Sequence, residues 1–334
     1  MDHVSGTGFP VPPFRGTTGP PGVSAAALPA WLTDGYVPLG RGAKPVRGWR
    51  LRAWGLSEVW RLELTGGKGP KTVIVKRATG GMAAEAARYR SLVVPLGLPA
   101  PRLLASVGGE GDGAVVLVLT DAGTHTLEQR PSAEGYGEAV RALARMRAAA
   151  SRRLTRQDRA PAPVRDAARF AESARVAAAG VARLRPRLAG ALDGPARWLA
   201  AHLDDTAPPT VVHSDFHPKN LVLGPDGAVT VVDWPLAYVG GHLGDLYCLL
   251  RDARKAGLAE QVGVAALPGV FARAAGLPPG GVLSDLAVGG LCWTVQALRW
   301  VVEEGVGVVA DWPQWLDELV ADARGLTGGA YAGG

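Results

Sequence analysis

Two short apolar runs joined by a Pro/Gly turn constrain the fold of this chain more than any other feature. The stretch from Val211 to Trp234 reads VVHSDFHPKNLVLGPDGAVTVVDW. Its apolar segments 221–223 and 229–232 flank a Gly-Pro-Asp-Gly turn at 224–227. A turn of this kind between two β-branched runs predicts a β-hairpin, and a hairpin places the ends of its two strands side by side.

The polar residues of this stretch stand where the hairpin begins and ends. His213 and Asp215 precede it, Asn220 stands directly before its first strand, and Asp233 follows its second strand. The hairpin is therefore expected to bring Asp215, Asn220 and Asp233 to one edge. An Asp in such a loop can accept the proton of an attacking hydroxyl, and Asn and Asp oxygens suit the Mg2+ that bridges nucleotide phosphates.

The spacing His-x-Asp-x-x-x-x-Asn, followed by a strand ending in Asp-Trp, resembles the aminoglycoside phosphotransferase-like family of the protein-kinase-like superfamily. The resemblance implies that Asp215 orients or deprotonates an acceptor hydroxyl and that Asn220 and Asp233 hold one or two Mg2+ ions. It also implies that His213 is a packing and hydrogen-bonding scaffold. Lys219 has two open interpretations, a cation that stabilises the transferring phosphoryl group or an ordinary surface lysine.

A second part of the resemblance lies upstream. The run Thr72–Lys76 reads TVIVK and parallels the kinase strand whose Lys holds the α- and β-phosphates of the nucleotide. A helix is expected over 82–93, and Glu85 is the acidic residue in it. We predict that Lys76 and Glu85 form the ion pair that orients this lysine.

The remaining nucleotide contacts are assigned by position. Two strands expected at 49–54 and 58–64 are linked through Gly55 and Ser57, where kinase-like folds cover the phosphates; an ordinary hairpin turn is the alternative interpretation. The resemblance implies a hinge between lobes at about 117–122, where the backbone near Leu119 would bind the adenine. The segment GGKGPKT at 66–72 is no Walker loop, because Pro70 occupies the glycine position.

These features together predict an α+β, protein-kinase-like fold with two lobes. Residues 1–24, rich in Pro and Gly, are expected to form a mobile extension. Residues 25–120 would form an antiparallel β-sheet lobe with one helix, and 121–334 a mainly helical catalytic and substrate-binding lobe. The resemblance also implies that Asp245, near the start of a helix in the latter lobe, braces the catalytic loop.

Composition narrows the class of protein further. The 334 residues are 47% hydrophobic and 20% charged, with a net charge of +6, which is typical of a folded globular protein. Basic residues are not interleaved with aromatic ones, so nucleic-acid binding is not favoured. The two cysteines provide no disulfide framework, and neither a signal peptide nor a membrane-spanning segment is expected. We therefore predict that the protein is cytoplasmic and that its cysteines are reduced.

Other residues limit what the resemblance carries over. Ser214 stands where the family has Gly, and Trp234-Pro235 follows the metal-binding Asp, so no glycine hinge is expected there. His217 and His242 are interpreted as local loop residues, since their spacing fits no zinc site.

The predicted function is an ATP- or GTP-dependent O-phosphotransferase that uses Mg2+ and acts on a small hydroxylated molecule, an antibiotic or natural-product-type metabolite. Two alternatives stay open. One is a peptide Ser/Thr kinase acting on a precursor peptide in a tailoring pathway. The other is a pseudokinase-like nucleotide-binding module. The sequence indicates no oligomeric state.

Overall fold

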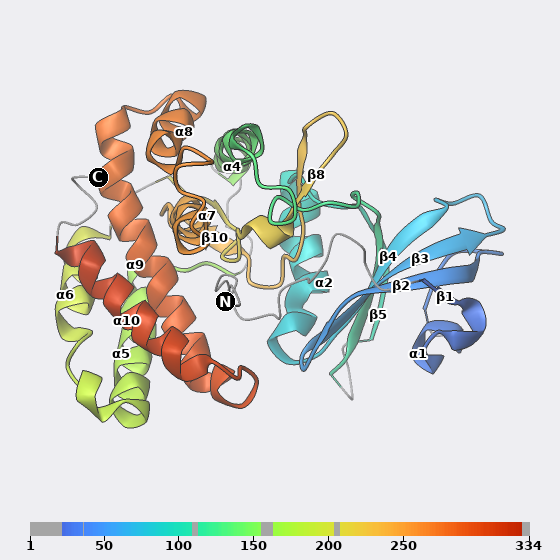
Figure 1. Ribbon diagram of the computed structural model, residues 1–334, viewed down its shortest axis with the longest axis horizontal. Coiled ribbons are helices and arrows are strands. Elements are labelled where there is room, and N and C mark those ends of the chain that lie inside the picture. The colour runs from blue at the N-terminus through green and yellow to red at the C-terminus, as the bar shows by residue number, and fades with distance from the viewer. Residues whose placement is uncertain (1–21, 36, 109–112, 155–162, 204–207, 329–334) are drawn as a thin grey trace.

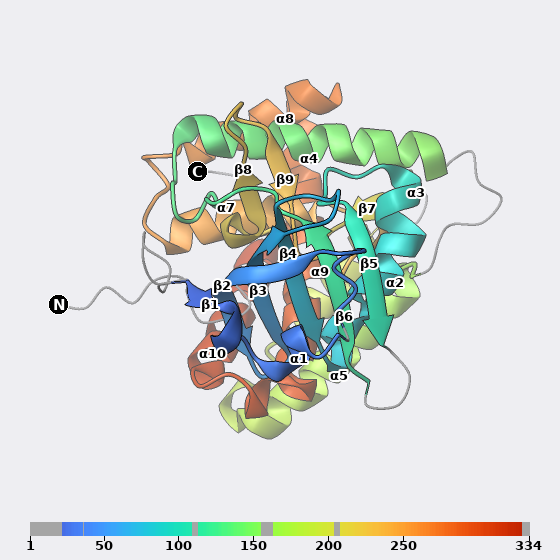
Figure 2. The ribbon, with the colours of Figure 1, turned by 90° about the vertical axis from the view of Figure 1, so that its right-hand side faces the viewer.

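The computed structural model describes residues 22–35, 37–108, 113–154, 163–203 and 208–328. Figure 1 shows a β-sheet lobe on the right and a larger helical lobe on the left. Figure 2 looks onto the sheet, with the helices of the large lobe behind it. The predicted α+β, two-lobed fold class is confirmed.

The small lobe is built on one antiparallel sheet with strand order β1-β2-β3-β4-β6-β5. Its strands are β1 (Val23–Ser24), β2 (Lys44–Trp54), β3 (Ser57–Thr65), β4 (Thr72–Ala78), β5 (Leu103–Gly108) and β6 (Val115–Thr120). A 3-10 turn (Ala25–Ala27) and α1 (Ala30–Thr33) follow β1. Residues 1–21 of the predicted 1–24 extension lie outside the described residues. Its last two residues depart from the prediction, because they form β1 on the sheet edge.

The helix expected over 82–93 is a composite of several helical types. A 3-10 segment (Gly80–Ala84) leads into α2 (Glu85–Arg88), a π-helical turn (Tyr89–Val93) and α3 (Val94–Leu96). Pro95 has no backbone N–H to donate and its ring crowds the preceding turn, which disturbs the regular α-helical ladder. The π-turn keeps Tyr89 and Leu92 fully buried against the core.

The large lobe is mainly helical. It contains α4 (Ala133–Leu154), α5 (Ala167–Leu184), α6 (Asp193–His202), α7 (Gly244–Lys255), α8 (Leu267–Ala275), α9 (Pro279–Glu303) and α10 (Trp312–Thr327). Short 3-10 turns lie at Pro186–Leu188, Pro218–Asn220, Val264–Ala266 and Gly305–Gly307. By length and composition α9 could cross a membrane, but 67% of its most apolar window is buried inside this lobe.

Two small antiparallel ribbons carry the predicted hairpin region. One pairs β8 (Leu221–Leu223) with β9 (Val229–Val231), and the other pairs β7 (Thr210–Val212) with β10 (Tyr238–Gly240). The hairpin was therefore predicted correctly between 221 and 231. The apolar dipeptide at 211–212 belongs to the other ribbon, because its partner strand comes after Asp233 in the chain.

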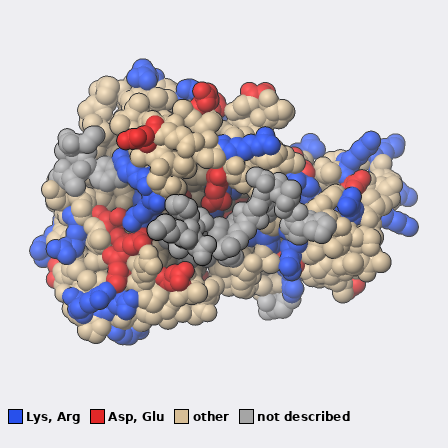
Figure 3. All heavy atoms as spheres, in the orientation of Figure 1, with Lys and Arg blue, Asp and Glu red and all other residues tan. Residues whose placement is uncertain are grey.

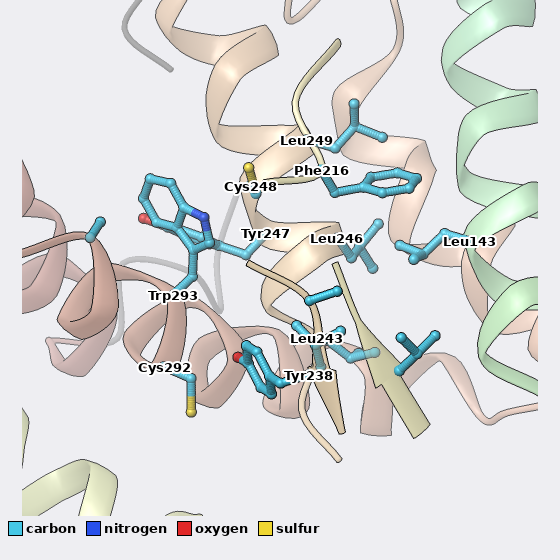
Figure 4. Packing of buried hydrophobic residues seen from close by; sticks show 14 of the residues in the cluster. Leu143, Phe216, Tyr238, Leu243, Leu246, Tyr247, Cys248, Leu249, Cys292 and Trp293 are labelled. Carbon is cyan, nitrogen blue, oxygen red and sulfur yellow. The ribbon is translucent and has the colours of Figure 1, made fainter. Parts of the chain in front are cut away.

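Two hydrophobic cores hold the molecule. The larger runs through the helical lobe and continues under the sheet, while the smaller lies on the opposite face of the sheet around Trp60 and Leu62. Figure 4 shows Phe216, from the catalytic loop, pointing into the larger core near Leu143 and Leu246. The loop is thus anchored by an apolar side chain between its polar residues. On the surface, the face in Figure 3 carries more Lys and Arg than Asp and Glu over the β-sheet lobe.

Candidate active site

The hairpin brings the predicted catalytic residues together at one edge. Leu221 pairs with Val231, and the amide of Val232 donates to the carbonyl of Asn220 at 2.9 Å. Asp233 therefore leaves the hairpin beside Asn220. The side-chain amide Nδ2 of Asn220 donates to both the backbone oxygen (2.9 Å) and Oδ2 (2.7 Å) of Asp215.

The predicted ion pair of the small lobe is present and extends to the large lobe. Nζ of Lys76 lies 2.5 Å from Oε2 of Glu85 and 2.6 Å from Oδ1 of Asp233. The other carboxylate oxygen of Glu85 accepts from the Trp234 amide at 3.1 Å. Burial alone would lower the pKa of Lys76, but Asp233 and Glu85 outweigh it and raise that pKa to about 12. The lysine therefore stays charged.

The catalytic loop is braced from the start of α7. The carboxylate of Asp245 accepts the backbone N–H groups of His213 (2.7 Å) and Ser214 (2.8 Å). Nε2 of His213 contacts the Val232 carbonyl at 3.1 Å, while its Nδ1 accepts from the Asp215 amide at 3.3 Å. The ring is thus held at both nitrogens, with Nε2 facing an acceptor and Nδ1 facing a donor. The scaffold roles expected of Asp245 and His213 are confirmed.

Two residues of the site adopt the left-handed backbone conformation, which residues other than Gly rarely adopt. Ser214 has φ of 72° and Asp233 has φ of 69°. The first value explains why a Gly suits the middle of the loop motif, since Gly reaches positive φ without a steric penalty. The carbonyl of Ser214 accepts a bond from the Trp293 indole at 3.2 Å, which helps to hold this conformation.

His217 was interpreted as a local loop residue, and the structure corrects this. The ring is fully buried, with Nδ1 2.5 Å from Oδ2 of Asp252 and Nε2 3.0 Å from Oδ1 of Asp215. Burial would lower the pKa of His217, but the two flanking carboxylates raise it well above the usual value. Asp252 lies on α7, 37 positions after Asp215 in the chain, so no local pattern links the two.

His242 is also more than a loop residue. Its buried Nε2 lies 2.7 Å from the Tyr238 hydroxyl, which in turn accepts from the Gln296 amide at 2.7 Å. Burial lowers the pKa of His242 to about 3, so the ring is neutral and structural. Within the described ranges, no cluster of His, Cys, Asp and Glu could hold a metal such as zinc.

A second cation reaches Asp233, and sequence analysis missed it. Nη1 of Arg52, on β2, lies 3.3 Å from Oδ2 of Asp233. Burial would raise the pKa of Asp233, but Lys76 and Arg52 outweigh it and lower that pKa. Arg52 is one of several arginines on a strand, and only the register of the sheet distinguishes it from the others.

The comparison with protein families decides the class. Residues 48–277 match the model of the phosphotransferase enzyme family. The chain belongs to this family. The match covers Lys76, Glu85, the whole catalytic hairpin and Asp245. The charged residues of the site therefore all lie in the part of this phosphotransferase that matches the family. It is a kinase-like enzyme that acts on hydroxyl groups.

Solved structures share the fold of this phosphotransferase at low identity. A Ralstonia eutropha JMP134 protein assigned to the aminoglycoside phosphotransferases superposes with a TM-score of 0.60 at 17% identity, over 91% of this chain and 96% of that one. A thermostable variant of APH(4)-Ia with AMP-PNP and hygromycin B gives 0.58 at 15%, over 91% and 99%. APH(3'')-Id from Streptomyces rimosus gives 0.51 at 20%, over 78% and 93%. Among curated proteins, none matches the sequence significantly.

The residues assigned to the nucleotide occupy distinct places in this phosphotransferase. Gly55 lies in the turn between β2 and β3, and a Cβ added there would meet Val308 of the large lobe at 3.7 Å. The Ser57 hydroxyl accepts from the Trp54 indole at 2.6 Å. Leu119 is buried in β6, opposite Ile74 on one side and Leu103 on the other. Their contacts with a nucleotide stay a prediction.

Lys219 and the Asp215 carboxylate form a loose pair. Nζ of Lys219 lies 3.9 Å from Oδ2 of Asp215, and the lysine side chain is mostly buried. Burial would raise the pKa of Asp215, but Lys219 and His217 outweigh it and hold that pKa well below its usual range. Asp215 is therefore ionised at neutral pH, as a hydrogen-bond acceptor for a hydroxyl requires.

Asn220 and Asp233 fit a Mg2+ ion by the chemistry of their donor atoms. Both offer hard oxygens. Asn220 uses Nδ2 for Asp215, which leaves its carbonyl oxygen as the atom for a metal. Asp233 is paired with two cations, which lower its pKa and keep its carboxylate in the ionised form that a metal ion binds.

Proposed function

We propose that this phosphotransferase transfers the γ-phosphoryl group of ATP or GTP to a hydroxyl of a small molecule, with Mg2+ bound by Asn220 and Asp233. The observation that carries the proposal is the convergence of one charged network from separate elements. Lys76 on β4, Glu85 on α2 and Asp233 after β9 are joined within 2.6 Å, and Asp215 lies on the same hairpin edge.

The residues would divide the work of phosphoryl transfer. Lys76 grips the α- and β-phosphates, held in place by Glu85. Asp215 accepts the proton of the acceptor hydroxyl. The hydroxyl oxygen forms a bond to the γ-phosphorus while the bond between the γ-phosphorus and the β,γ-bridging oxygen breaks. The nucleoside diphosphate leaves, and the proton passes from Asp215 to solvent. Bound Mg2+ would neutralise phosphate charge during this step.

Lys219 has a defined place in this scheme. It stands directly before Asn220 and faces the Asp215 carboxylate, so its ammonium would lie beside the phosphoryl group as it moves to the acceptor. We propose that it stabilises the charge of the transferring group. The mostly buried side chain supports this role over that of an ordinary surface lysine.

The acceptor is proposed as an antibiotic or natural-product-type metabolite. Structural relatives are described in complex with hygromycin B and with streptomycin, both small hydroxylated molecules. A cytoplasmic location is proposed as well, because the nucleotide is found there and both cysteines are buried free thiols.

The experiment is an acceptor screen with the purified full chain. The protein is incubated with Mg-ATP or Mg-GTP and with aminoglycosides, other hydroxylated antibiotics or candidate precursor peptides, and release of nucleoside diphosphate is measured. A small-molecule acceptor should stimulate turnover, and Asp215→Ala should reduce it by about 10²- to 10⁴-fold, the usual contribution of a general base. Nucleotide binding by Asp215→Ala should persist.

Each other outcome of the screen has a meaning. Stimulation by peptides alone would replace the small-molecule proposal with a peptide Ser/Thr kinase. Nucleotide binding without any turnover, unchanged by Asp215→Ala, would indicate a pseudokinase-like module. Absence of nucleotide binding by the wild type in a thermal-shift assay would refute the proposal altogether.

A further inference from the structure

Four residues form a straight row across the sheet of the small lobe. Arg52 on β2 is paired with Val59 on β3, Val59 with Lys76 on β4, and Lys76 with Leu117 on β6. Residues directly opposite each other in adjacent strands project from the same face of a sheet. Arg52 and Lys76 therefore face the large lobe together, on the side where Asp233 lies.

A β-bulge gives Arg52 this orientation. Arg50 is paired with Trp60, and the next pair is Arg52 with Val59, so Leu51 is an extra residue in β2. Trp60 packs in the small core on the opposite face of the sheet. Side chains alternate along a strand, so without the bulge Arg52 would share the face of Arg50, away from the site. Bulges next to active sites commonly re-aim a side chain in this way.

The guanidinium of Arg52 has N–H donors that its contacts in this structure do not use. One Nη atom lies 3.3 Å from Asp233, a carboxylate that already has Lys76 at 2.6 Å. Within the described part of the chain, its buried Nε has no hydrogen-bond partner. A guanidinium offers five N–H donors in a planar fork that matches phosphate oxygens.

We propose that Arg52 is a second phosphate-binding residue, which pairs with Asp233 in the free protein and binds a nucleotide phosphate beside Lys76 in the complex. The inference rests on the proposed function. Asp233 is one of the two residues that would hold Mg2+, and with its carboxylate bound to the metal, Lys76 and Arg52 would become available to the phosphates. The exchange keeps every charge paired before and after binding.

The β2–β3 turn gives a reason for such a residue. Kinase-like folds cover the phosphates with several glycines whose backbone N–H groups approach the ligand, and this turn has the single Gly55. Arg52 lies three residues before Gly55, on the strand β2 that leads into the turn, and would supply side-chain donors instead. It reaches the site from the lobe that covers the nucleotide.

The test is calorimetric binding of Mg-AMP-PNP and of adenosine to the full chain. Arg52→Gln should weaken binding of Mg-AMP-PNP by about tenfold or more, the usual effect of losing a charge-assisted hydrogen bond, and leave adenosine binding unchanged. Arg52→Met, which keeps the aliphatic stem, should show the same loss, and Arg52→Lys a smaller one. The matched control is Arg50→Gln, on the same strand and the opposite face, whose affinity should stay within about twofold of the wild type.

The outcomes separate this inference from the function beneath it. If the wild type binds Mg-AMP-PNP and both Arg52→Gln and Arg52→Met bind it equally well, Arg52 does not contact phosphate. An equal loss of adenosine affinity would also overturn the inference, since it would indicate a general disturbance of the lobe. Failure of the wild type to bind Mg-AMP-PNP would instead refute the proposed function. Circular dichroism melts identify any variant that does not fold.

Discussion

Three carboxylates around the catalytic loop face at least one cation, whereas Asp245 accepts two backbone N–H groups instead. Asp233 has Lys76 and Arg52, Asp215 has Lys219 and His217, and Asp252 shares His217 with Asp215. Buried carboxylates are costly unless paired and hydrogen-bonded, and their cations lower the pKa values of Asp215 and Asp233 and keep both ionised. His217 is distinctive because it joins two of the three carboxylates, and Asp252 is its partner on α7.

At the residue scale we predict that Asp252→Asn impairs turnover without impairing nucleotide binding. An amide cannot stabilise the positive charge of His217, so the imidazole no longer holds Asp215 in one orientation. Misplacing a reacting group costs up to about 100-fold in rate, and we expect kcat to fall by about 10- to 100-fold with the Kd of Mg-AMP-PNP unchanged. Steady-state kinetics and calorimetry measure the two quantities.

The control for Asp252→Asn is Asp226→Asn, in the exposed turn of the β8–β9 hairpin, where the carboxylate accepts the Ala228 amide. It should leave kcat within about twofold of the wild type, as surface changes usually do. Equal kcat values for Asp252→Asn and the wild type would show that His217 does not position Asp215 through this pair.

At the scale of elements, the close contact between α9 and the start of α7 positions the catalytic loop. A Cβ added at Gly289 on α9 would lie 2.4 Å from the Leu243 carbonyl carbon and 2.6 Å from the Gly244 amide nitrogen. Backbone atoms cannot move aside as a flexible side chain does. Asp245 follows immediately and holds the loop through two backbone bonds, so Gly289 sets the distance on which the loop depends.

We therefore predict that Gly289→Ala destabilises the protein although Ala is the better helix former. Helix propensity favours Ala by up to about 1 kcal/mol. Overpacking typically costs about 1–3 kcal/mol, and we expect the larger end of this range because the contact is with backbone atoms. The free energy of unfolding in urea should fall. Gly325→Ala on α10 is the control, because its Cβ would meet nothing within 4 Å. That variant should gain up to about 1 kcal/mol. Equal stabilities for the two variants would contradict this account.

At the scale of the whole molecule, the two lobes are joined through the site itself. Lys76 and Arg52 of the small lobe bind Asp233, and Glu85 accepts the Trp234 amide. Figure 1 shows α2, the helix that carries Glu85, where the sheet lobe meets the helical lobe. Nucleotide binding is thus expected to change the contact between the lobes, because Asp233 takes part both in that contact and in the proposed metal site.

The prediction at this scale concerns ligand stabilisation. Mg-AMP-PNP at about 100 times its Kd should stabilise the wild type by about 2.7 kcal/mol, seen as a rise in Tm. Asp233→Ala removes the proposed metal ligand and should show no such rise. Wild type with AMP-PNP and a chelator should behave in the same way. A full Tm rise in Asp233→Ala would exclude Asp233 as the metal ligand.

Site residues that lie close together in the sequence were easier to predict than those that lie far apart. Asp215, Asn220 and Asp233 were found because one hairpin joins them, and Asp245 because it stands at a helix start in the family's position after the metal-binding Asp. Lys76 and Glu85 were found through the resemblance to kinase strands. The composite helix around Tyr89 was missed, since the balance of α- and π-hydrogen bonds near Pro95 depends on packing in the core.

From the sequence alone, the hairpin followed from residue types at short, regular spacing, and the fold class and the class of reaction followed from the family resemblance of the motifs. Only the tertiary structure decided that Arg52, and not Arg50, faces Asp233, and that Asp252 holds His217 against Asp215. The first depends on one extra residue in a strand, which reverses every side chain beyond it. The second depends on where α7 packs, since Asp252 on this helix comes 37 positions after Asp215 in the chain. Neither the pairing register nor the docking of a helix is encoded in local spacing, since both are settled by burying apolar surface across the whole molecule.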